Sequence, residues 1–242
     1  MAHALADTSI SDTIEHESVN GFEKKYEATQ TARIKKSSTS EAPIVLTDIY
    51  KDECNIAIWQ RRLNDDFLIS LTQYVQTGGK ITAARQLSSD SAEAYIRTLV
   101  DDQPFAPQLH AYIAELVDMF ICLFEAKTVG FRLSTLDKAM CPRFHVDRVP
   151  CRLVTTFLGS GSQWLEHDNS DRNKLGHKSG ATSNAESGLY STAQDIQTLN
   201  TGDVAILKGE LWHGNENAGI VHRSPPVSSS QPRIVMTLDL VG

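Results

Sequence analysis

A histidine and an aspartate stand two positions apart in the segment Arg143-Phe144-His145-Val146-Asp147-Arg148. On an extended strand, alternate side chains leave from the same face, so the His145 imidazole and the Asp147 carboxylate can lie side by side. Two histidines and one carboxylate that leave coordination positions open are a typical ligand set for iron(II). The pair therefore predicts a divalent-metal site that needs one more histidine from elsewhere in the chain.

Two downstream histidines could complete this ligand set. His222 lies in the motif Val-His-Arg-Ser-Pro-Pro, and His213 lies in Leu-Trp-His-Gly-Asn-Glu-Asn. Each is followed at a similar distance by an arginine, Arg233 after His222 and Arg223 after His213. We favour His222 and keep His213 as the alternative third ligand, because Arg233 opens a clear final strand.

Arg233 is also the first candidate for binding an anion beside the metal. A guanidinium presents a rigid fork of N–H donors, which can bind a carboxylate through two hydrogen bonds. Arg143 and Thr237 are secondary candidates for the same anion. A metal with three protein ligands keeps room for a bidentate 2-oxo acid and dioxygen.

Two other interpretations of these residues stay open. One is a zinc site, because thiolates and imidazoles are the usual ligands of zinc, although the spacing here matches no common zinc finger. Its donors would come from Cys141, His145, Cys151 and either His167 or His177. In the other interpretation, His145 and Asp147 form a structural hydrogen-bonded pair, and the protein is a metal-free binding module.

The composition limits the classes of partner. The chain has a net charge of −7 and a pI near 5.6, and it lacks a basic block, so neither nucleic acid nor an anionic membrane is expected as a partner. Its cysteines form no Cys-x-x-Cys motif, and we find no secretory signal and no apolar run of membrane-spanning length. We therefore expect a cytoplasmic protein with free thiols, acting on a small-molecule or protein substrate.

The chain divides by composition into a tail and a single domain. Residues 1–42 are rich in Ser, Thr, Glu and Lys, which predicts a disordered tail. Residues 43–242 are predicted to form one domain, mainly helical over 43–130 and mainly β over 131–242. A polar segment at about 159–201 predicts a long loop, part of which could act as a lid.

Helices followed by strands indicate an α+β fold. The predicted helices cover about 65–75, a segment opening at 89–91, and about 107–126; the predicted strands cover about 42–46, 152–158, 204–207 and 233–240. We expect the N-terminal helices to pack on a C-terminal double-stranded β-helix, a barrel of the jelly-roll or cupin kind. The mouth of such a barrel would carry the metal site.

Several motifs together resemble a known bacterial family, the domain of unknown function 1826. They are Ile-x-x-Trp-Gln-Arg at 56–61, Cys-Pro-Arg-Phe-His-Val-Asp-Arg-Val-Pro-Cys-Arg-Leu at 141–153, Lys-Leu-Gly-His at 174–177, Gly-Asp-Val-Ala-Ile-Leu-Lys-Gly at 202–209 and Val-His-Arg-Ser-Pro at 221–225. The resemblance covers residues 43–242. The family has no established activity, but its genes often lie near zinc-homeostasis genes, which implies a metal-related role.

The order of the ligands also resembles, more distantly, the iron(II)/2-oxoglutarate-dependent oxygenases. That resemblance implies iron(II) bound by His145, Asp147 and His222, with Arg233 binding the far carboxylate of 2-oxoglutarate. It names no substrate.

Overall fold

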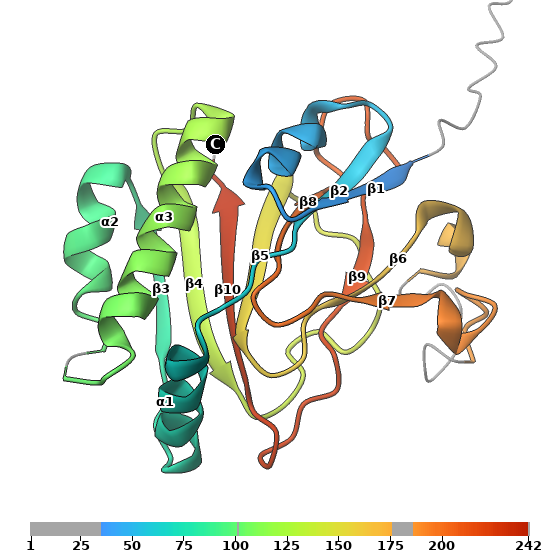
Figure 1. Ribbon diagram of the computed structural model, residues 1–242. Coiled ribbons are helices and arrows are strands. Elements are labelled where there is room, and N and C mark those ends of the chain that lie inside the picture. Colours follow the sequence, from blue (N-terminus) through green and yellow to red (C-terminus); the bar gives the residue numbers. More distant parts are fainter. Residues whose placement is uncertain (1–34, 101, 176–185, 242) are drawn as a thin grey trace, which may run out of the picture. The chain divides into compact units, whose positions relative to one another are not determined.

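The computed structural model of the protein describes residues 35–100, 102–175 and 186–241. In these residues the structure is a mixed α/β arrangement built on a large, seven-stranded β-sheet, with a second sheet of three strands and three α-helices. Figure 1 shows the large sheet between the helices on one side and the small sheet on the other.

The large sheet is antiparallel except at one edge, where its first two strands run parallel. In spatial order its strands are β1 (Lys36–Ser40), β2 (Cys54–Trp59), β8 (Val204–Lys208), β5 (Cys151–Leu158), β10 (Arg233–Leu240), β4 (Val129–Leu136) and β3 (Thr82–Leu87). The small sheet is antiparallel and consists of β7 (Ile196–Thr198), β6 (Gln163–Leu165) and β9 (Val221–Arg223).

The helices begin at residues that satisfy their first free N–H groups. Helix α1 (Asp65–Gln76) is capped by the Asn64 side chain, which accepts from the N–H of Phe67. Helix α2 (Ser89–Ile96) begins with a reciprocal pair of hydrogen bonds between Ser88 and Ser91. Helix α3 (Ala106–Phe124) has a proline in its first turn, where a missing N–H costs little. Short 3₁₀ helices lie at η1 (Pro43–Tyr50), η2 (His167–Asn169), η3 (Arg172–Lys174) and η5 (Ala193–Asp195).

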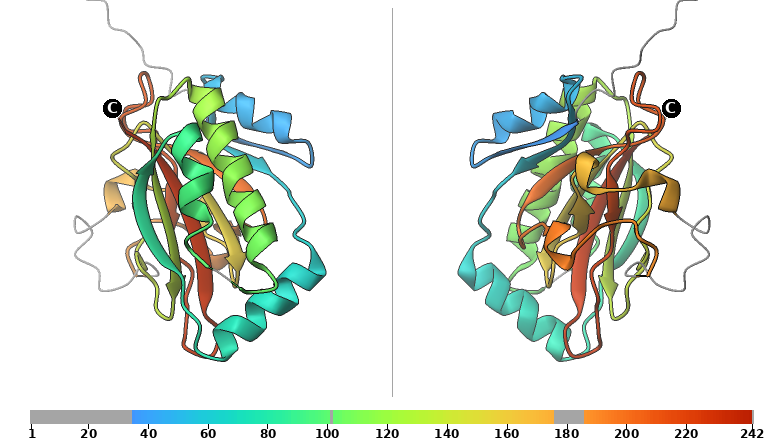
Figure 2. Two further views of the ribbon diagram at one scale, coloured as in Figure 1. Left: turned by 90° about the vertical axis from the view of Figure 1, so that its left-hand side faces the viewer. Right: turned by 90° about the vertical axis from the view of Figure 1, so that its right-hand side faces the viewer.

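Alternation along the strands gives the large sheet two different faces. One face shares a single apolar cluster with the helices. Figure 2 shows α2 and α3 lying over that face. On β10, for example, Ile234, Met236 and Leu238 belong to this cluster. Val235 belongs instead to a second cluster, which lies on the other face and includes Trp164 of the small sheet. The apolar, helix-facing side of the sheet therefore stabilises the domain, and the opposite side is available for a functional site.

Helix α3 supplies much of the helix-side cluster. Its buried residues recur at helical spacing and include Leu109, Ile113, Leu116 and Phe120. By length and composition alone α3 could span a membrane, but core helices of soluble proteins satisfy the same criterion. Six of its residues are buried in the helix-side cluster.

Some elements differ from the prediction. The three helices and the strands at 152–158, 204–207 and 233–240 are confirmed within a few residues. The predicted strand at 42–46 is wrong, because Pro43 begins the 3₁₀ helix η1. Residues 36–40, expected in a disordered tail, form β1, and the region expected to be mainly helical also contributes β2 and β3. Part of the predicted loop at 159–201 forms β6 and β7, while residues 176–185 lie outside the described part of the chain.

We expect the substitution Leu116→Ala to lower the free energy of unfolding by about 2–5 kcal/mol, because it leaves a cavity between α3 and the large sheet. Leu116 is 0% exposed. Leu211, which is 58% exposed, provides the matched control, and Leu211→Ala should change stability by less than about 0.5 kcal/mol. Urea denaturation of both variants tests this, and equal losses would contradict the packing described.

Candidate metal centre

His145 and His222 lie directly opposite each other across an isolated antiparallel bridge. Each backbone N–H donates to the carbonyl oxygen of the other residue, at 3.0 Å in both directions. Residues paired in this way project their side chains to the same side, and the two imidazole centroids are 4.5 Å apart. Two segments distant in the sequence are thus fixed at the point where their histidines meet.

Asp147 follows His145 on a loop, and a second loop holds it in place. The N–H of Glu210 donates to the Asp147 carbonyl at 3.0 Å, and the N–H of Leu211 donates to the Val149 carbonyl at 3.2 Å. A Cβ atom at Gly209 would lie 2.1 Å from the Val149 oxygen and 2.9 Å from the Asp147 oxygen. Glycine is therefore required where the two loops touch.

Both histidines direct the same ring nitrogen at Asp147. The Nδ1 atom of His145 lies 2.9 Å from the Arg143 carbonyl oxygen, and Nδ1 of His222 lies 3.2 Å from the Ile220 carbonyl oxygen. A carbonyl oxygen only accepts, so we assign the proton to Nδ1 in each ring, which leaves a lone pair on Nε2. The two Nε2 atoms lie 3.5 and 3.3 Å from the Asp147 carboxylate oxygens.

Three electron-pair donors therefore converge on one point. The ligand atoms of His145, Asp147 and His222 all lie within 4.8 Å of one another, the one such group among the described histidine, cysteine and acidic residues. Neutral imidazoles and a carboxylate so close together repel unless a cation lies between them. The donor set fits a divalent metal with nitrogen and oxygen ligands and open coordination positions.

The electrostatics of Asp147 agree with this assignment. Burial alone would raise the pKa of Asp147, but the neighbouring His145 and His222 rings and the charge of Arg152 hold that pKa well below its usual range. Burial lowers the pKa of His145, but the contacts with Asp147 and the Arg143 carbonyl raise it overall. A cation at this point, either a proton or a metal ion, is thus favoured by the surrounding groups.

Arg152 fixes the carboxylate from behind. Its guanidinium donates to both oxygens of Asp239, at 2.6 and 3.0 Å, and to Oδ2 of Asp147 at 2.7 Å. Arg152 and Asp239 are cross-strand partners on β5 and β10. This support orients the ligand carboxylate and leaves its Oδ1 atom free of the arginine.

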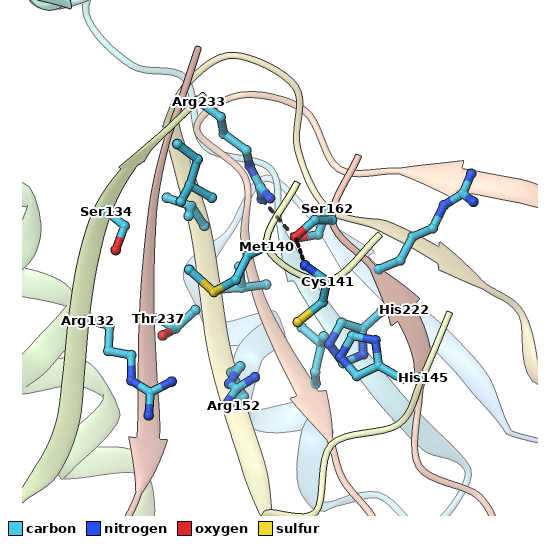
Figure 3. A pocket seen from close by; sticks show the side chains of 16 residues that line it. Arg132, Ser134, Met140, Cys141, His145, Arg152, Ser162, His222, Arg233 and Thr237 are labelled. Atoms are coloured by element: carbon cyan, nitrogen blue, oxygen red, sulfur yellow. Dashed lines mark hydrogen bonds between the residues drawn. The ribbon is translucent and has the colours of Figure 1, made fainter. Parts of the chain in front are cut away.

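The pocket that His145 and His222 line also contains a buried guanidinium, which has no carboxylate partner in the described residues. Arg233, which opens β10, is 2% exposed and donates to the hydroxyls of Thr156 and Ser162, each at 2.9 Å. Burial lowers the pKa of Arg233 to about 10, so the group is still charged at neutral pH. Figure 3 shows it pointing toward Ser162, with His145 and His222 in another part of the pocket. A buried, unneutralised cation is suited to binding an anion.

The other predicted residues lie around this centre or away from it. His213 is exposed in the turn between β8 and β9, and Arg143 contributes its carbonyl to His145 while its side chain is absent from the described pocket lining. Cys141 lines the pocket, but Cys151 is buried on the helix side of the sheet. His167 lies on η2, outside the ligand group, and His177 falls outside the described residues.

The residues that support the centre were not predicted from the sequence. Arg152, itself held by Asp239, donates to the Asp147 carboxylate. Thr156 and Ser162 accept from the Arg233 guanidinium. Asp239 lies an even number of positions after Arg233 on the final strand. Alternation along that strand alone could therefore have placed both side chains on the same face of the sheet. Nothing local in the sequence marks Ser162.

Solved structures similar to this chain include a dioxygenase for auxin oxidation from rice. It is 13% identical, with 86% of this chain and 83% of that chain covered and a TM-score of 0.45. Dioxygenase for auxin oxidation 1 from Arabidopsis thaliana, in a binary complex with 2-oxoglutarate, is 10% identical, with 86% and 93% covered and a TM-score of 0.45. A prolyl-4-hydroxylase from Pseudomonas putida is 10% identical, with 82% and 98% covered and a TM-score of 0.42. At these scores the likeness is too distant to bear on function.

No curated protein matches the sequence. The family expected from the motifs is confirmed by a family model that covers most of the chain. That model, described as a protein of unknown function (DUF1826), matches residues 40–239, and the chain therefore belongs to the DUF1826 family.

Proposed function

We propose that the protein is a metal-dependent oxygenase that uses iron(II) and 2-oxoglutarate. One observation carries the proposal: two imidazole lone pairs and a carboxylate converge beside a pocket that contains a buried guanidinium without a carboxylate partner in the described residues. A metal ion and an anionic cosubstrate would satisfy both features at once. Metal-free packing would leave both unsatisfied.

Iron(II) fits the ligand set better than structural zinc does. A structural zinc site has four protein ligands, often cysteines, and is closed to exchange. Here the group of described metal-binding side chains has three members, with no thiolate among them. Cys151, one of the candidate zinc ligands, faces the helices because it lies next to Arg152 on β5 and so has the opposite parity. No contact in the described part of the chain supports a role in zinc homeostasis.

Arg233 would bind the distal carboxylate of 2-oxoglutarate. The Thr156 and Ser162 hydroxyls lie against the guanidinium, so they fix its direction and could add hydrogen bonds to the same anion. The 2-oxo acid end would take open positions at the metal. A dicarboxylate has one acidic group for the metal and one for the guanidinium of Arg233.

Bound iron(II) would supply the oxidative step, in which O₂ converts 2-oxoglutarate to succinate and CO₂ and places one oxygen atom in a substrate C–H bond. The chain's own residues have positioning roles in this proposal. Two backbone carbonyls hold the imidazoles, Arg152 holds the Asp147 carboxylate, and Arg233 holds the cosubstrate. The substrate is a small molecule or a protein side chain that enters the same pocket.

We expect His222→Ala and Asp147→Ala each to weaken metal binding by more than about 100-fold, because removing even a hydrogen-bond partner of a metal ligand costs about 10- to 100-fold in affinity. His213→Ala is the matched control and should bind metal like the wild type, since His213 is exposed and outside the ligand group. The measurement is elemental analysis after anaerobic reconstitution with iron and zinc in competition.

Full iron binding by His222→Ala, or its loss in His213→Ala, would contradict the assigned ligands. Tight stoichiometric zinc in the wild type, with no response to 2-oxoglutarate, would favour a zinc-binding protein instead. A wild type that binds neither metal would leave the three residues as a structural cluster.

We expect Arg233→Gln to weaken 2-oxoglutarate binding by at least about tenfold, because a charged hydrogen-bonded pair is lost. Metal binding should persist, and the free energy of unfolding should be unchanged or higher, because an unneutralised buried charge is removed. Titration of the anaerobic iron-loaded protein, followed by its visible absorbance and by succinate formation, tests this. The control is Arg97→Gln, on the helix side, and unchanged 2-oxoglutarate affinity in Arg233→Gln would refute the role.

A further inference from the structure

The pocket around the metal centre is lined by more positive charge than a single dicarboxylate would neutralise. Four arginines line it, namely Arg132, Arg152, Arg223 and Arg233, and the described lining residues include no Asp or Glu. The nearby carboxylates, Asp147 and Asp239, both accept hydrogen bonds from Arg152. The charge of Arg152 is therefore already balanced.

Two of the remaining three arginines have other partners. Arg233 is assigned to 2-oxoglutarate under the function proposed above. Arg223 donates from Nε to Gln163 at 2.8 Å, and its guanidinium lies over the Phe144 ring at 4.4 Å. Arg132 has no ion pair with a described residue, and its side chain is exposed at the pocket.

Hydroxyl groups accompany Arg132 on the same face of the sheet. Arg132 on β4 is directly opposite Thr237 on β10, so the two side chains are cross-strand neighbours. Ser134 is two residues along β4 and shares the face of Arg132. All three residues line the pocket, and Figure 3 shows them together on β4 and β10. A guanidinium with two hydroxyls is a suitable donor set for a carboxylate or a phosphate.

Arg132 and Arg233 lie at separate places on the wall of the pocket, and Figure 3 shows their guanidinium groups in different parts of it. Arg132 is paired with Thr237, four positions beyond Arg233 on β10, which corresponds to about 13 Å along a strand. The nearest acidic neighbour of Arg132 across the strands is Asp239, diagonal to it, and both Asp239 oxygens accept from Arg152. The two arginines therefore mark separate anion positions on one wall of the pocket.

We infer that Arg132, Thr237 and Ser134 form a second anion subsite, which binds a carboxylate or phosphate group of the primary substrate. The identification of the bound anion as a substrate rests on the proposed function, but the subsite itself is independent of the metal. It restricts the substrate to anionic molecules, or to protein segments that carry an acidic or phosphorylated side chain. The anionic group would hold the substrate on β4 and β10, beside the metal ligands.

Ligand-observed NMR on the full chain tests the subsite with three probes of similar size: phenyl phosphate, benzoate and the neutral benzyl alcohol. Each is titrated into the wild type and into Arg132→Gln, Arg233→Gln and the control Arg97→Gln. We expect at least one anion to bind the wild type, Arg97→Gln and Arg233→Gln. Binding to Arg132→Gln should be at least about tenfold weaker, because a charged hydrogen-bonding partner is lost. Thr237→Val, a smaller change on the opposite strand, should weaken binding less.

The comparison of the two anions decides between carboxylate and phosphate as the preferred group. Affinity should fall as salt is added, since the site is exposed at the pocket. Equal binding to Arg132→Gln and wild type, equal binding of benzyl alcohol and the anions, or no anion binding to the wild type would each overturn the inference. If anions still bind metal-free Arg233→Gln, the subsite exists independently of the proposed function. The proposed function fails separately, if iron and 2-oxoglutarate do not bind.

Discussion

The backbone pair between His145 and His222 is the constraint on which the candidate centre depends. Its two 3.0 Å hydrogen bonds join the segment between β4 and β5 to the short strand β9. Without that pair, the irregular segment that carries His145 would have no fixed relation to β9, which carries His222. The pair also fixes where Asp147 must lie, because Asp147 is two residues beyond His145 and its loop is bound at Gly209. One ligand set thus results from two backbone contacts rather than from any single rigid element.

The two faces of the large sheet have different roles, one in stability and the other in the candidate site. Its helix-facing side is filled by buried aliphatic and aromatic residues, and its other side carries Arg152, Arg233, Thr237 and Arg132. Because side chains alternate along a strand, a dry face and a charged face can occupy the same strands. A change in one face therefore need not disturb the other. The bidentate Arg152–Asp239 pair links two central strands where the charged face begins and supports the Asp147 carboxylate at the same time.

Local patterns in the sequence account for part of this arrangement. Helical spacing predicts α1 and α3, and the alternation in 233–240 predicts the final strand. The spacing of His145 and Asp147 predicts their common side, although the segment forms only an isolated bridge rather than a strand. What could not be predicted is long-range pairing. Residues 36–40 have few apolar side chains and gain order by pairing with β2, and Ser162 reaches Arg233 only once β5 and β6 are folded.

The charged groups of the centre lower the stability of the fold when no ligand is bound. Arg233 is a buried cation without a carboxylate partner in the described residues, and two imidazole nitrogens face the Asp147 carboxylate at 3.5 and 3.3 Å. Packing on the helix side must compensate for both features, because apolar burial is independent of ligand. A metal ion and a dicarboxylate would remove both costs in the folded state alone, so their binding would be coupled to folding. For a ligand present at 100 times its dissociation constant this coupling is worth about 2.7 kcal/mol. The residues that destabilise the protein without ligands are therefore the ones through which a metal ion and a dicarboxylate would stabilise it.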